Sequence, residues 1–355
     1  MKWLEQPDII IVCVALQIAK GFEFMIKFRP SIIAIVLIFL CGCSTSANKA
    51  EFEIEKTFFA MDTSVSYFGN AEAYDSVNQL ITDLDGLFDR YSDSSDIYAI
   101  NNRKKTTLSD YTNEIITLSN NLSKKYGSDV NIFSGEITDC WKINSENPTV
   151  PSDDEINKAL KNTENTVFSM ERMSFESDCG SIDLGSVGKG YALDKAYELL
   201  GDENCYIISM NSSILLSGKK SDGSKFTVSV RNPENGSEII GTIKTDACFL
   251  STSGGYERFF EADGKKYSHI FDVSTARPVN TDLTSVTVMC DSGIESDFLS
   301  TLIYIGGSNK LGKYLKNDKI KLLAVTENNE IYMSDGLDFS LAENSDYSIK
   351  VSENA

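Results

Sequence analysis

The feature that most constrains the fold is a change in hydrophobic periodicity between the two halves of the chain. Residues 74–92 and 113–127 carry apolar side chains at helical spacing, and Ser152 with Glu155 forms a capping-box start for a third helix. Later apolar residues form strand-length, β-branched or aromatic runs, at residues 205–210, 225–231, 238–244, 247–252, 284–290 and 320–327. The sequence therefore predicts amphipathic helices over a sheet and a strand-rich C-terminal half.

The absence of repeats and linkers indicates the domain organisation. The sequence shows no internal repeat and no obvious linker after residue 50. We therefore expect an α+β fold, built as a single intertwined two-lobed unit over residues 53–340 with a mixed or antiparallel sheet and flanking helices. Residues 341–355 are expected to form an acidic tail.

Charge and cysteine usage exclude several classes of protein. The 33 basic and 52 acidic residues give a formal net charge of -19, which argues against nucleic acid and anionic lipid surfaces as general partners. An anionic ligand would need a local site. Five cysteines follow residue 50, are widely spaced and form no C-x-x-C pair, so they indicate neither a zinc site nor a disulfide framework: Cys140, Cys179, Cys205, Cys248 and Cys290.

The N-terminal segment has the pattern of a targeting signal. Lys27 and Arg29 precede an apolar run over residues 32–40, which is too short for a comfortable membrane-spanning helix. The run leads into Leu40-Cys41-Gly42-Cys43, which looks like a lipobox with Cys43 as the lipidated residue. An uncleaved N-terminal anchor is the alternative.

The targeting pattern predicts the location of the mature protein. Residues 1–42 would be a signal peptide, with residues 1–24 arising from a start codon assigned too far upstream. Residues 43–52 would be the lipid attachment and a short tether. We expect a protein anchored by lipid to the cell membrane and working outside the cytoplasm.

A glycine-rich junction at residues 185–190 is the first candidate for chemistry. A short apolar strand ends near Asp183, a helix is predicted to begin near Val187, and Lys189 lies at its start. Backbone N–H groups at a helix start and an ammonium together suit a phosphate. The spacing is not that of a P-loop, and an ordinary strand-to-helix turn explains this segment equally well when it is taken alone.

A second candidate lies at the start of another predicted helix. Asp297, Ser300 and Thr301 fall within about one helical turn. Their oxygen atoms are hard donors of the kind that suits Mg²⁺. Acidic residues are also common at ordinary helix starts, so this pattern alone leaves both interpretations open.

Taken together and in order, these segments resemble the ApbE family, the FAD:protein FMN transferases. The resemblance covers roughly residues 53–340, and the matching segments are residues 60–69 (AMDTSVSYFG), 87–101 (LFDRYSDSSDIYAIN), 183–196 (DLGSVGKGYALDKA), 230–233 (VRNP), 251–279 (STSGGYERFFEADGKKYSHIFDVSTARPV) and 285–301 (SVTVMCDSGIESDFLST). The segment 251–279 is the most specific of these.

The resemblance implies a reaction and a site. FMN would be transferred from FAD to a Ser or Thr hydroxyl of a target protein, with AMP leaving and Mg²⁺ assisting. By similarity, FAD would be bound by Met61, Tyr91, Asp129, Val130, Asn131, Asp183 and Lys189. The metal would be held by Asp297, Thr301 and the Ser186 carbonyl, with Ser300 beside them. The sequence contains no convincing acceptor motif of its own, so the expected partner is another chain, an FMN-binding redox protein at the membrane.

His269 is the single histidine of the sequence. A lone histidine is usually structural, but a hydroxyl nucleophile needs a base that titrates near neutrality. We therefore predict that His269 is the general base. Asp272 could orient it, provided that a turn brings the two side chains together, because residues i and i+3 of a strand face opposite ways.

Several positions depart from the family pattern. Asn131, Phe133-Ser134 and Ser212-Ser213 stand where Thr, Gly-Pro and Gly-Gly are usual, and Asp62, Ser274 and Ala276 replace Gly, Arg and Gly. These changes keep two alternatives open. One is a lipoprotein that binds FAD without transferring FMN, and the other is an FAD pyrophosphatase that releases FMN and AMP.

Overall fold

The centre of the molecule is a nine-stranded sheet. We describe residues 52–104 and 107–350 of a computed structural model. The strand order is β1-β2-β5-β6-β9-β14-β15-β16-β18, and every neighbouring pair is antiparallel except β16 and β18. Their bounds are β1 (Ile54–Ala60), β2 (Thr63–Gly69), β5 (Tyr206–Met210), β6 (Ser213–Ser217), β9 (Cys248–Ser253), β14 (Leu283–Cys290), β15 (Lys321–Thr326), β16 (Glu330–Met333) and β18 (Ser348–Lys350).

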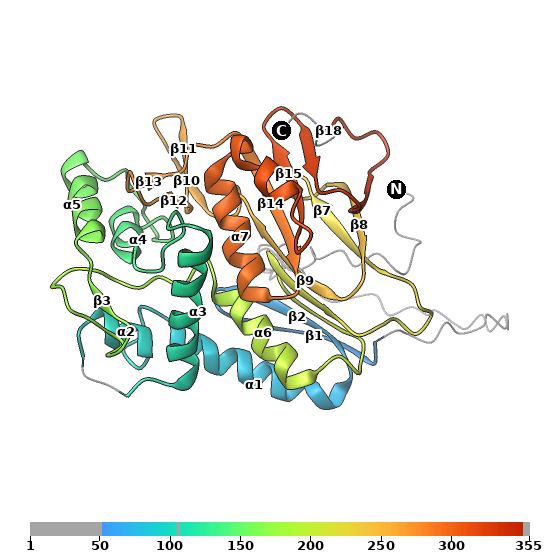
Figure 1. The fold of residues 1–355 in the computed structure, drawn as a ribbon, viewed down its shortest axis with the longest axis horizontal. Helices are drawn as coiled ribbons and strands as arrows, with labels where there is room; N and C mark the ends of the chain where they lie inside the picture. The colour runs from blue at the N-terminus through green and yellow to red at the C-terminus, as the bar shows by residue number, and fades with distance from the viewer. Residues whose placement is uncertain (1–51, 105–106, 351–355) are drawn as a thin grey trace, which may run out of the picture.

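Helices cover one face of this sheet and a small second sheet covers the other. Helices α1 (Ala71–Phe88), α6 (Gly188–Leu200) and α7 (Gly293–Gly306) lie across the first face, with α3 (Asp110–Tyr126) beside α7 (Figure 1). The second sheet has the order β17-β8-β7, from β17 (Asp338–Leu341), β8 (Ile239–Thr245) and β7 (Phe226–Arg231). Successive strand residues such as Ile207 and Ile208 enter opposite cores, as the alternation of side chains in a strand requires.

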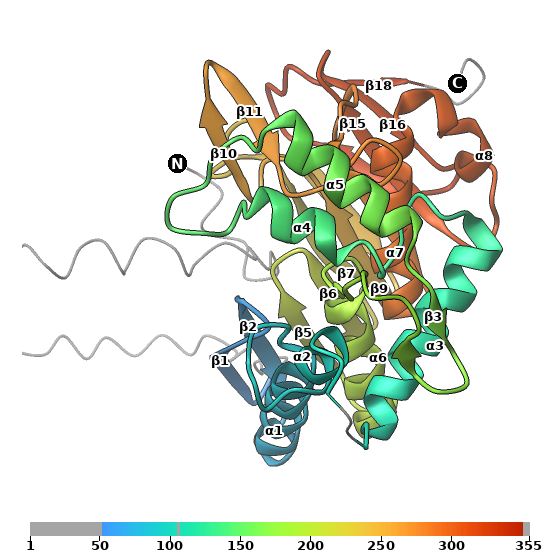
Figure 2. The ribbon, with the colours of Figure 1, turned by 90° about the vertical axis from the view of Figure 1, so that its left-hand side faces the viewer.

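A second lobe lies on the side of the molecule away from β18 (Figures 1 and 2). It contains α4 (Gly135–Trp141) packed on α5 (Asp153–Glu164), and its small core includes Trp141, Ile156, Phe260 and Ala276. The Trp141 Nε1–H donates to the Ala276 carbonyl at 2.8 Å. The other short elements are α2 (Asp96–Asn101), β3 (Phe168–Ser169), β4 (Ser174–Phe175), β10 (Phe259–Ala262), β11 (Lys265–Ser268), β12 (Phe271–Asp272), β13 (Arg277–Pro278), η1 (Ser308–Lys310) and α8 (Gly312–Leu315).

The fold confirms the α+β prediction with a large mixed sheet and flanking helices. The two predicted amphipathic helices are α1 and α3, and Ser152 and Glu155 form a complete capping box at the start of α5. The ordered fold continues past residue 340, because β18 pairs with β16 and Tyr347 is buried. The predicted signal peptide and lipidated Cys43 lie outside the described residues. Among the residues that are described, no helix has the length and apolar character needed to span a bilayer.

Candidate functional site

Helices α6 and α7 meet at a pair of glycines. A Cβ atom at Gly190 would lie 2.1 Å from the carbonyl oxygen of Gly293, and one at Gly293 would lie 2.2 Å from that of Gly190. Only glycine allows two backbones this close. Asp194 of α6 adds to the junction, because its carboxylate accepts the N–H groups of Gly293 at 2.6 Å and Ile294 at 2.8 Å. The first turns of the two helices are therefore held side by side.

Asp297 projects into this junction and is buried. Its Oδ2 accepts the Gly190 N–H at 2.9 Å, and its Oδ1 accepts the Ser213 hydroxyl at 3.0 Å. Burial raises the pKa of Asp297, and the positive charge of Lys189 opposes the rise. No salt bridge within the described part of the chain includes Asp297. A buried carboxylate in this state fits a bound cation.

Hydroxyl oxygens lie next to this carboxylate. Ser300 and Thr301 donate to the backbone carbonyl of Asp297 at 3.0 and 3.3 Å, and both hydroxyls contact the Ser253 hydroxyl of β9, at 2.8 and 3.0 Å. The structure therefore brings together three of the predicted metal residues. Ser186 lies in the turn just before α6. The described residues contain no cluster of three His, Cys, Asp or Glu that could hold a metal, so a cation here would need hydroxyl and carbonyl oxygens beside the one carboxylate.

Lys189 occupies the second position of α6 and points to the turn between β5 and β6. Its Nζ donates to the Ser212 hydroxyl. The backbone of this turn is fixed to β9, because the Thr252 N–H donates to the Ser212 carbonyl at 2.8 Å. The glycine-rich junction predicted from the sequence is thus the start of a helix with an ammonium beside it, which is an arrangement suited to an anion.

Met61 lies at the tip of the β1–β2 hairpin, next to the same helix start. Both turn residues have positive φ, 53° at Met61 and 56° at Asp62, as a two-residue hairpin turn of type I′ requires. A Cβ atom at Gly188 would lie 3.4 Å from the Met61 Cε. The Asp62 carbonyl accepts a guanidinium N–H of Arg258 at 3.3 Å. The hairpin therefore connects α6 to the segment that carries His269.

His269 lies between β11 and β12 and is partly buried. Its backbone N–H and its Nδ1 each lie 3.1 Å from the Arg258 carbonyl oxygen. Since a carbonyl only accepts, Nδ1 carries the ring hydrogen and Nε2 carries the lone pair. Burial lowers the pKa of His269 to about 4, with the charges of Arg258 and Lys189 acting in the same direction and that of Asp183 opposing them. The imidazole is therefore neutral at pH 7, and its pKa lies below the near-neutral range expected of the base from the sequence.

The structure does not pair Asp272 with His269. The Asp272 carboxylate accepts the backbone N–H of Ser274 at 2.9 Å and its hydroxyl at 2.6 Å, which stabilises the turn between β12 and β13. The contact that the structure records for the His269 ring is with the Arg258 carbonyl. His269 lies in a bend before β12, and the turn that follows β12 takes up the Asp272 carboxylate.

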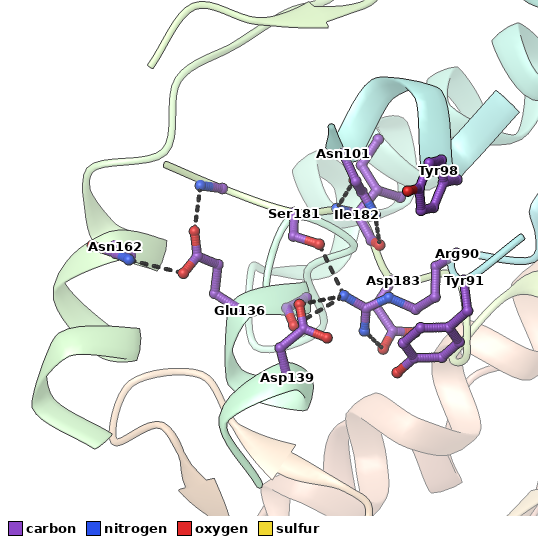
Figure 3. Close-up of polar contacts among 12 residues, drawn as sticks. Arg90, Tyr91, Tyr98, Asn101, Glu136, Asp139, Asn162, Ser181, Ile182 and Asp183 are labelled. Atoms are coloured by element: carbon purple, nitrogen blue, oxygen red, sulfur yellow. Dashed lines mark hydrogen bonds and ion pairs between the residues drawn. The ribbon is translucent and has the colours of Figure 1, made fainter. Parts of the chain in front are cut away.

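Arg90 connects Asp183 and Tyr91 to the second lobe (Figure 3). Its guanidinium donates to Asp183 Oδ2 at 3.0 Å, to Asp139 Oδ2 at 2.9 Å and to Ser181 Oγ at 2.9 Å. The Arg90 side chain is only 10% exposed. Tyr91 is 72% exposed, and the centre of the guanidinium lies 5.4 Å from its ring centroid. Arg90 therefore fixes one predicted FAD residue and packs against another.

The segment before Asp183, which forms only an isolated bridge at Ser181 and not the predicted strand, is also held by α2. The Asn101 side chain accepts the Ile182 N–H at 2.7 Å and donates to the Ile182 carbonyl at 3.0 Å (Figure 3). The Asp183 N–H in turn donates to the Ile132 carbonyl at 2.8 Å. Asp183 is thus placed by long-range contacts with three separate segments.

The predicted FAD residues 129–131 are mostly engaged by the protein itself. Asp129 forms an ion pair with Lys310 at 3.2 Å, and both line a cavity of about 440 Å³. The Val130 side chain is buried in the main core. The Asn131 side chain accepts the Phe133 N–H at 3.0 Å. Their backbone carbonyls are engaged as well, because the Val130 carbonyl accepts the Ser123 hydroxyl at 2.9 Å and the Asn131 carbonyl accepts the Ser134 hydroxyl at 2.6 Å.

Three of the departures from the family pattern can be placed in the structure. Phe133 packs against Phe168 and Phe175, with ring centroids 4.7 and 6.3 Å away. Asp62 and Ala276 have φ of 56° and 52°, in the left-handed region where glycine is favoured. These two residues carry backbone strain that the usual glycine would avoid, of order 1 kcal/mol each.

Sequence reasoning missed four residues that build the site: Arg90, Asp194, Ser253 and Arg258. All of them lie inside the family-like segments, and Arg90 directly precedes Tyr91. Its position next to Tyr91 was the sequence signal that could have identified Arg90 as a site residue. Arg90, Asp194 and Ser253 have partners more than 40 residues away in the sequence, and Arg258 contacts Asp62 across 196 positions, so local patterns do not reveal these contacts.

Comparisons with known proteins agree with this architecture. The FAD:protein FMN transferase of Escherichia coli (strain K12) is 24% identical over 277 residues, covering 74% of this chain and 79% of the relative. The protein of the same name from Vibrio cholerae is 24% identical over 316 residues, covering 83% and 92%.

Solved structures show the same fold. The ApbE protein of Thermotoga maritima superimposes with a TM-score of 0.70 at 25% identity, covering 82% of this chain and 97% of that structure. The flavin transferase ApbE from Vibrio cholerae gives a TM-score of 0.67 at 20% identity, covering 79% and 97%. The ApbE family profile matches residues 57–325. The chain therefore belongs to the ApbE family.

Proposed function

We propose that this protein is an FAD:protein FMN transferase that moves FMN from FAD to a Ser or Thr hydroxyl of another protein, with Mg²⁺ assisting. Support comes from the names of its relatives. The observation that carries the mechanism is a neutral His269 whose Nε2 is available, in the electrostatic field of Lys189 and Asp183. A base and an anion-binding group thus lie in one region.

The reaction forms one bond and breaks another. The acceptor oxygen bonds to the phosphorus of the FMN half, and the bond from that phosphorus to the bridging anhydride oxygen breaks. AMP leaves with the bridging oxygen. His269 Nε2 takes the proton of the acceptor hydroxyl, and the Arg258 carbonyl stabilises the resulting imidazolium through Nδ1–H.

Two charges of the site assist this displacement. Lys189 lies at the start of α6, where its ammonium and the helix N–H groups favour the pyrophosphate. Asp297, Thr301 and the Ser186 carbonyl would hold Mg²⁺, which supplies positive charge to the pyrophosphate and the leaving AMP. The absence of an ion pair to Asp297 among the described residues is consistent with this assignment.

The location of the reaction follows from the N-terminal pattern. Lipidation of Cys43 would anchor the enzyme outside the cytoplasm and near membrane-bound redox proteins. Such proteins are the acceptor class that we propose.

One experiment separates transfer from the two alternatives. The purified protein is incubated with FAD, Mg²⁺ and an FMN-binding redox subunit from the same membrane, and every flavin species is followed by mass spectrometry. We expect the acceptor to gain FMN. One free AMP should be released for each transfer. Free FMN with AMP and an unmodified acceptor would indicate a pyrophosphatase, and intact FAD would indicate binding alone.

Asp297→Asn tests the metal assignment in the same assay. The amide keeps the shape of the side chain but removes its charge, so transfer should collapse at ordinary Mg²⁺ concentration and recover only in part at high Mg²⁺. At neutral pH without Mg²⁺, the variant should unfold at the same or a higher temperature than wild type, because burial disfavours the Asp297 carboxylate. An unchanged Mg²⁺ dependence would place the cation elsewhere.

A further inference from the structure

Two adjacent serines at the β5–β6 turn contact the two opposite charges of the site. Met210 pairs with Ser213 across the hairpin, and Ser213 pairs with Ser251 of β9. The Thr252 N–H also donates to the Ser212 carbonyl at 2.8 Å. The turn is therefore fixed on both sides by the central sheet, and its hydroxyls have defined positions.

Ser213 fixes the direction of the Asp297 carboxylate. Ser213 is fully buried, and its hydroxyl donates to Asp297 Oδ1 at 3.0 Å while Gly190 N–H donates to Oδ2 at 2.9 Å. One donor comes from the sheet and the other from α6. With both oxygens bonded, the carboxylate has no freedom to rotate about its terminal torsion.

Ser212 acts on the other charge. Its hydroxyl accepts from Lys189 Nζ. Lys189 and Asp297 influence each other electrostatically, yet the structure records no salt bridge between these two described side chains, whose polar atoms bond instead to the neighbouring serines. A direct ion pair would neutralise both groups and compete with their ligands.

We propose that the β5–β6 turn is a positioning element that keeps the two charges apart and oriented. Ser213 holds Asp297 ready for a divalent cation, and Ser212 holds Lys189 ready for a pyrophosphate. This inference rests on the proposed function and adds two positioning residues to it. It also gives a role to the serines that depart from the family pattern.

Ser209 provides a matched control. It lies on β5, opposite Ile214 of β6, and is buried like Ser213. Its hydroxyl has no hydrogen-bond partner among the described residues. Ser209→Ala therefore makes the same chemical change at the same depth in the sheet without touching either charge.

The test measures two affinities separately on the purified protein. Mg²⁺ binding is measured by calorimetry without FAD, and FAD binding is measured by fluorescence in EDTA. Ser213→Ala should weaken Mg²⁺ binding by roughly 10- to 100-fold, as loss of a partner to a ligating carboxylate does, and leave FAD binding unchanged. Ser212→Ala should weaken FAD binding by roughly tenfold, as loss of a hydrogen bond to a charged group does, and leave Mg²⁺ binding unchanged.

Further variants separate positioning from folding. Ser213→Thr keeps a hydroxyl and should retain Mg²⁺ affinity. Ser213→Cys has only a weak donor and should lose Mg²⁺ affinity, so it provides the test if Ser213→Ala does not fold. Ser209→Ala should match wild type in both measurements. Mg²⁺ affinity equal to or tighter than that of wild type in folded Ser213→Ala or Ser213→Cys would overturn the proposal. A wild-type protein that binds no Mg²⁺ would refute the metal assignment itself.

Discussion

Replacing Arg90 by Met removes the charge that connects the end of α1, Asp183 and Asp139 of α4. The substitution keeps an unbranched side chain of similar reach. It leaves the Asp183 and Asp139 carboxylates close together without their shared cation, and it removes a donor from the Ser181 hydroxyl and the Gly135 carbonyl. We expect both the stability and the FAD affinity to fall.

The magnitude follows from burial. Removing one partner of a buried ion pair costs about 3–5 kcal/mol. The Arg90 side chain is 10% exposed and that of Asp183 23%, but that of Asp139 is 48% exposed and can be hydrated. We therefore expect the lower value, about 3 kcal/mol, which corresponds to a decrease in Tm of ~5 °C for a fold of this size. Burial raises the pKa of Asp139 and Arg90 opposes the rise, so the loss should become smaller as the pH falls and Asp139 takes up a proton.

Urea unfolding and FAD fluorescence titration measure the two effects. Arg172→Met is the matched control, because Arg172 pairs with Glu176 at the surface, where their side chains are 67% and 41% exposed, and such pairs contribute about 1 kcal/mol or less. In Arg90→Met we expect FAD affinity to fall by about tenfold as Asp183 loses its fixed position. If Arg90→Met costs no more than Arg172→Met, the view of Arg90 as a buried organising charge is wrong.

Three further predictions address other parts of the molecule. His269→Asn should bind FAD normally but transfer FMN about 10²–10⁴-fold more slowly, and transfer at the wild-type rate in a variant that folds and binds FAD would rule out His269 as the base. Because burial lowers the pKa of His269 to about 4, wild type should lose stability as the pH falls from about 6.5 toward 4, while the variant loses less. Gly190→Ala should lower the melting temperature and the Mg²⁺ affinity together, because its Cβ would lie 2.1 Å from the Gly293 carbonyl oxygen. The control Gly86→Ala on α1, where nothing lies within 4 Å, should be neutral or stabilising by up to about 1 kcal/mol. Equal melting temperatures of the two variants would contradict the close crossing of α6 and α7. Cys43→Ala should abolish acylation in membrane fractions, and normal acylation of that variant would refute the lipobox.

The sequence by itself determined the elements and the chemical inventory. Helical spacing identified α1 and α3, and a local pair, Ser152 and Glu155, predicted the cap of α5. Strand-length runs identified the major strands of the second half. These features depend on residues that are near one another in the chain, where side-chain periodicity and local hydrogen bonds control the backbone. The family-like segments are also read along the chain, and their order identified the family.

The tertiary structure alone decided how the site is assembled. It brought Asp297 to Gly190 and Ser213, and it gave His269 the Arg258 carbonyl in place of Asp272. Asp297 and Ser213 are 84 positions apart, and Arg90 and Asp183 are 93 apart. No local periodicity encodes such pairs, because they form only when the sheet and helices pack and buried polar groups must find partners wherever the fold places them. The sequence could therefore name the charged residues of the site, while the packing of α6, α7 and the β5–β6 turn determined which atoms face one another.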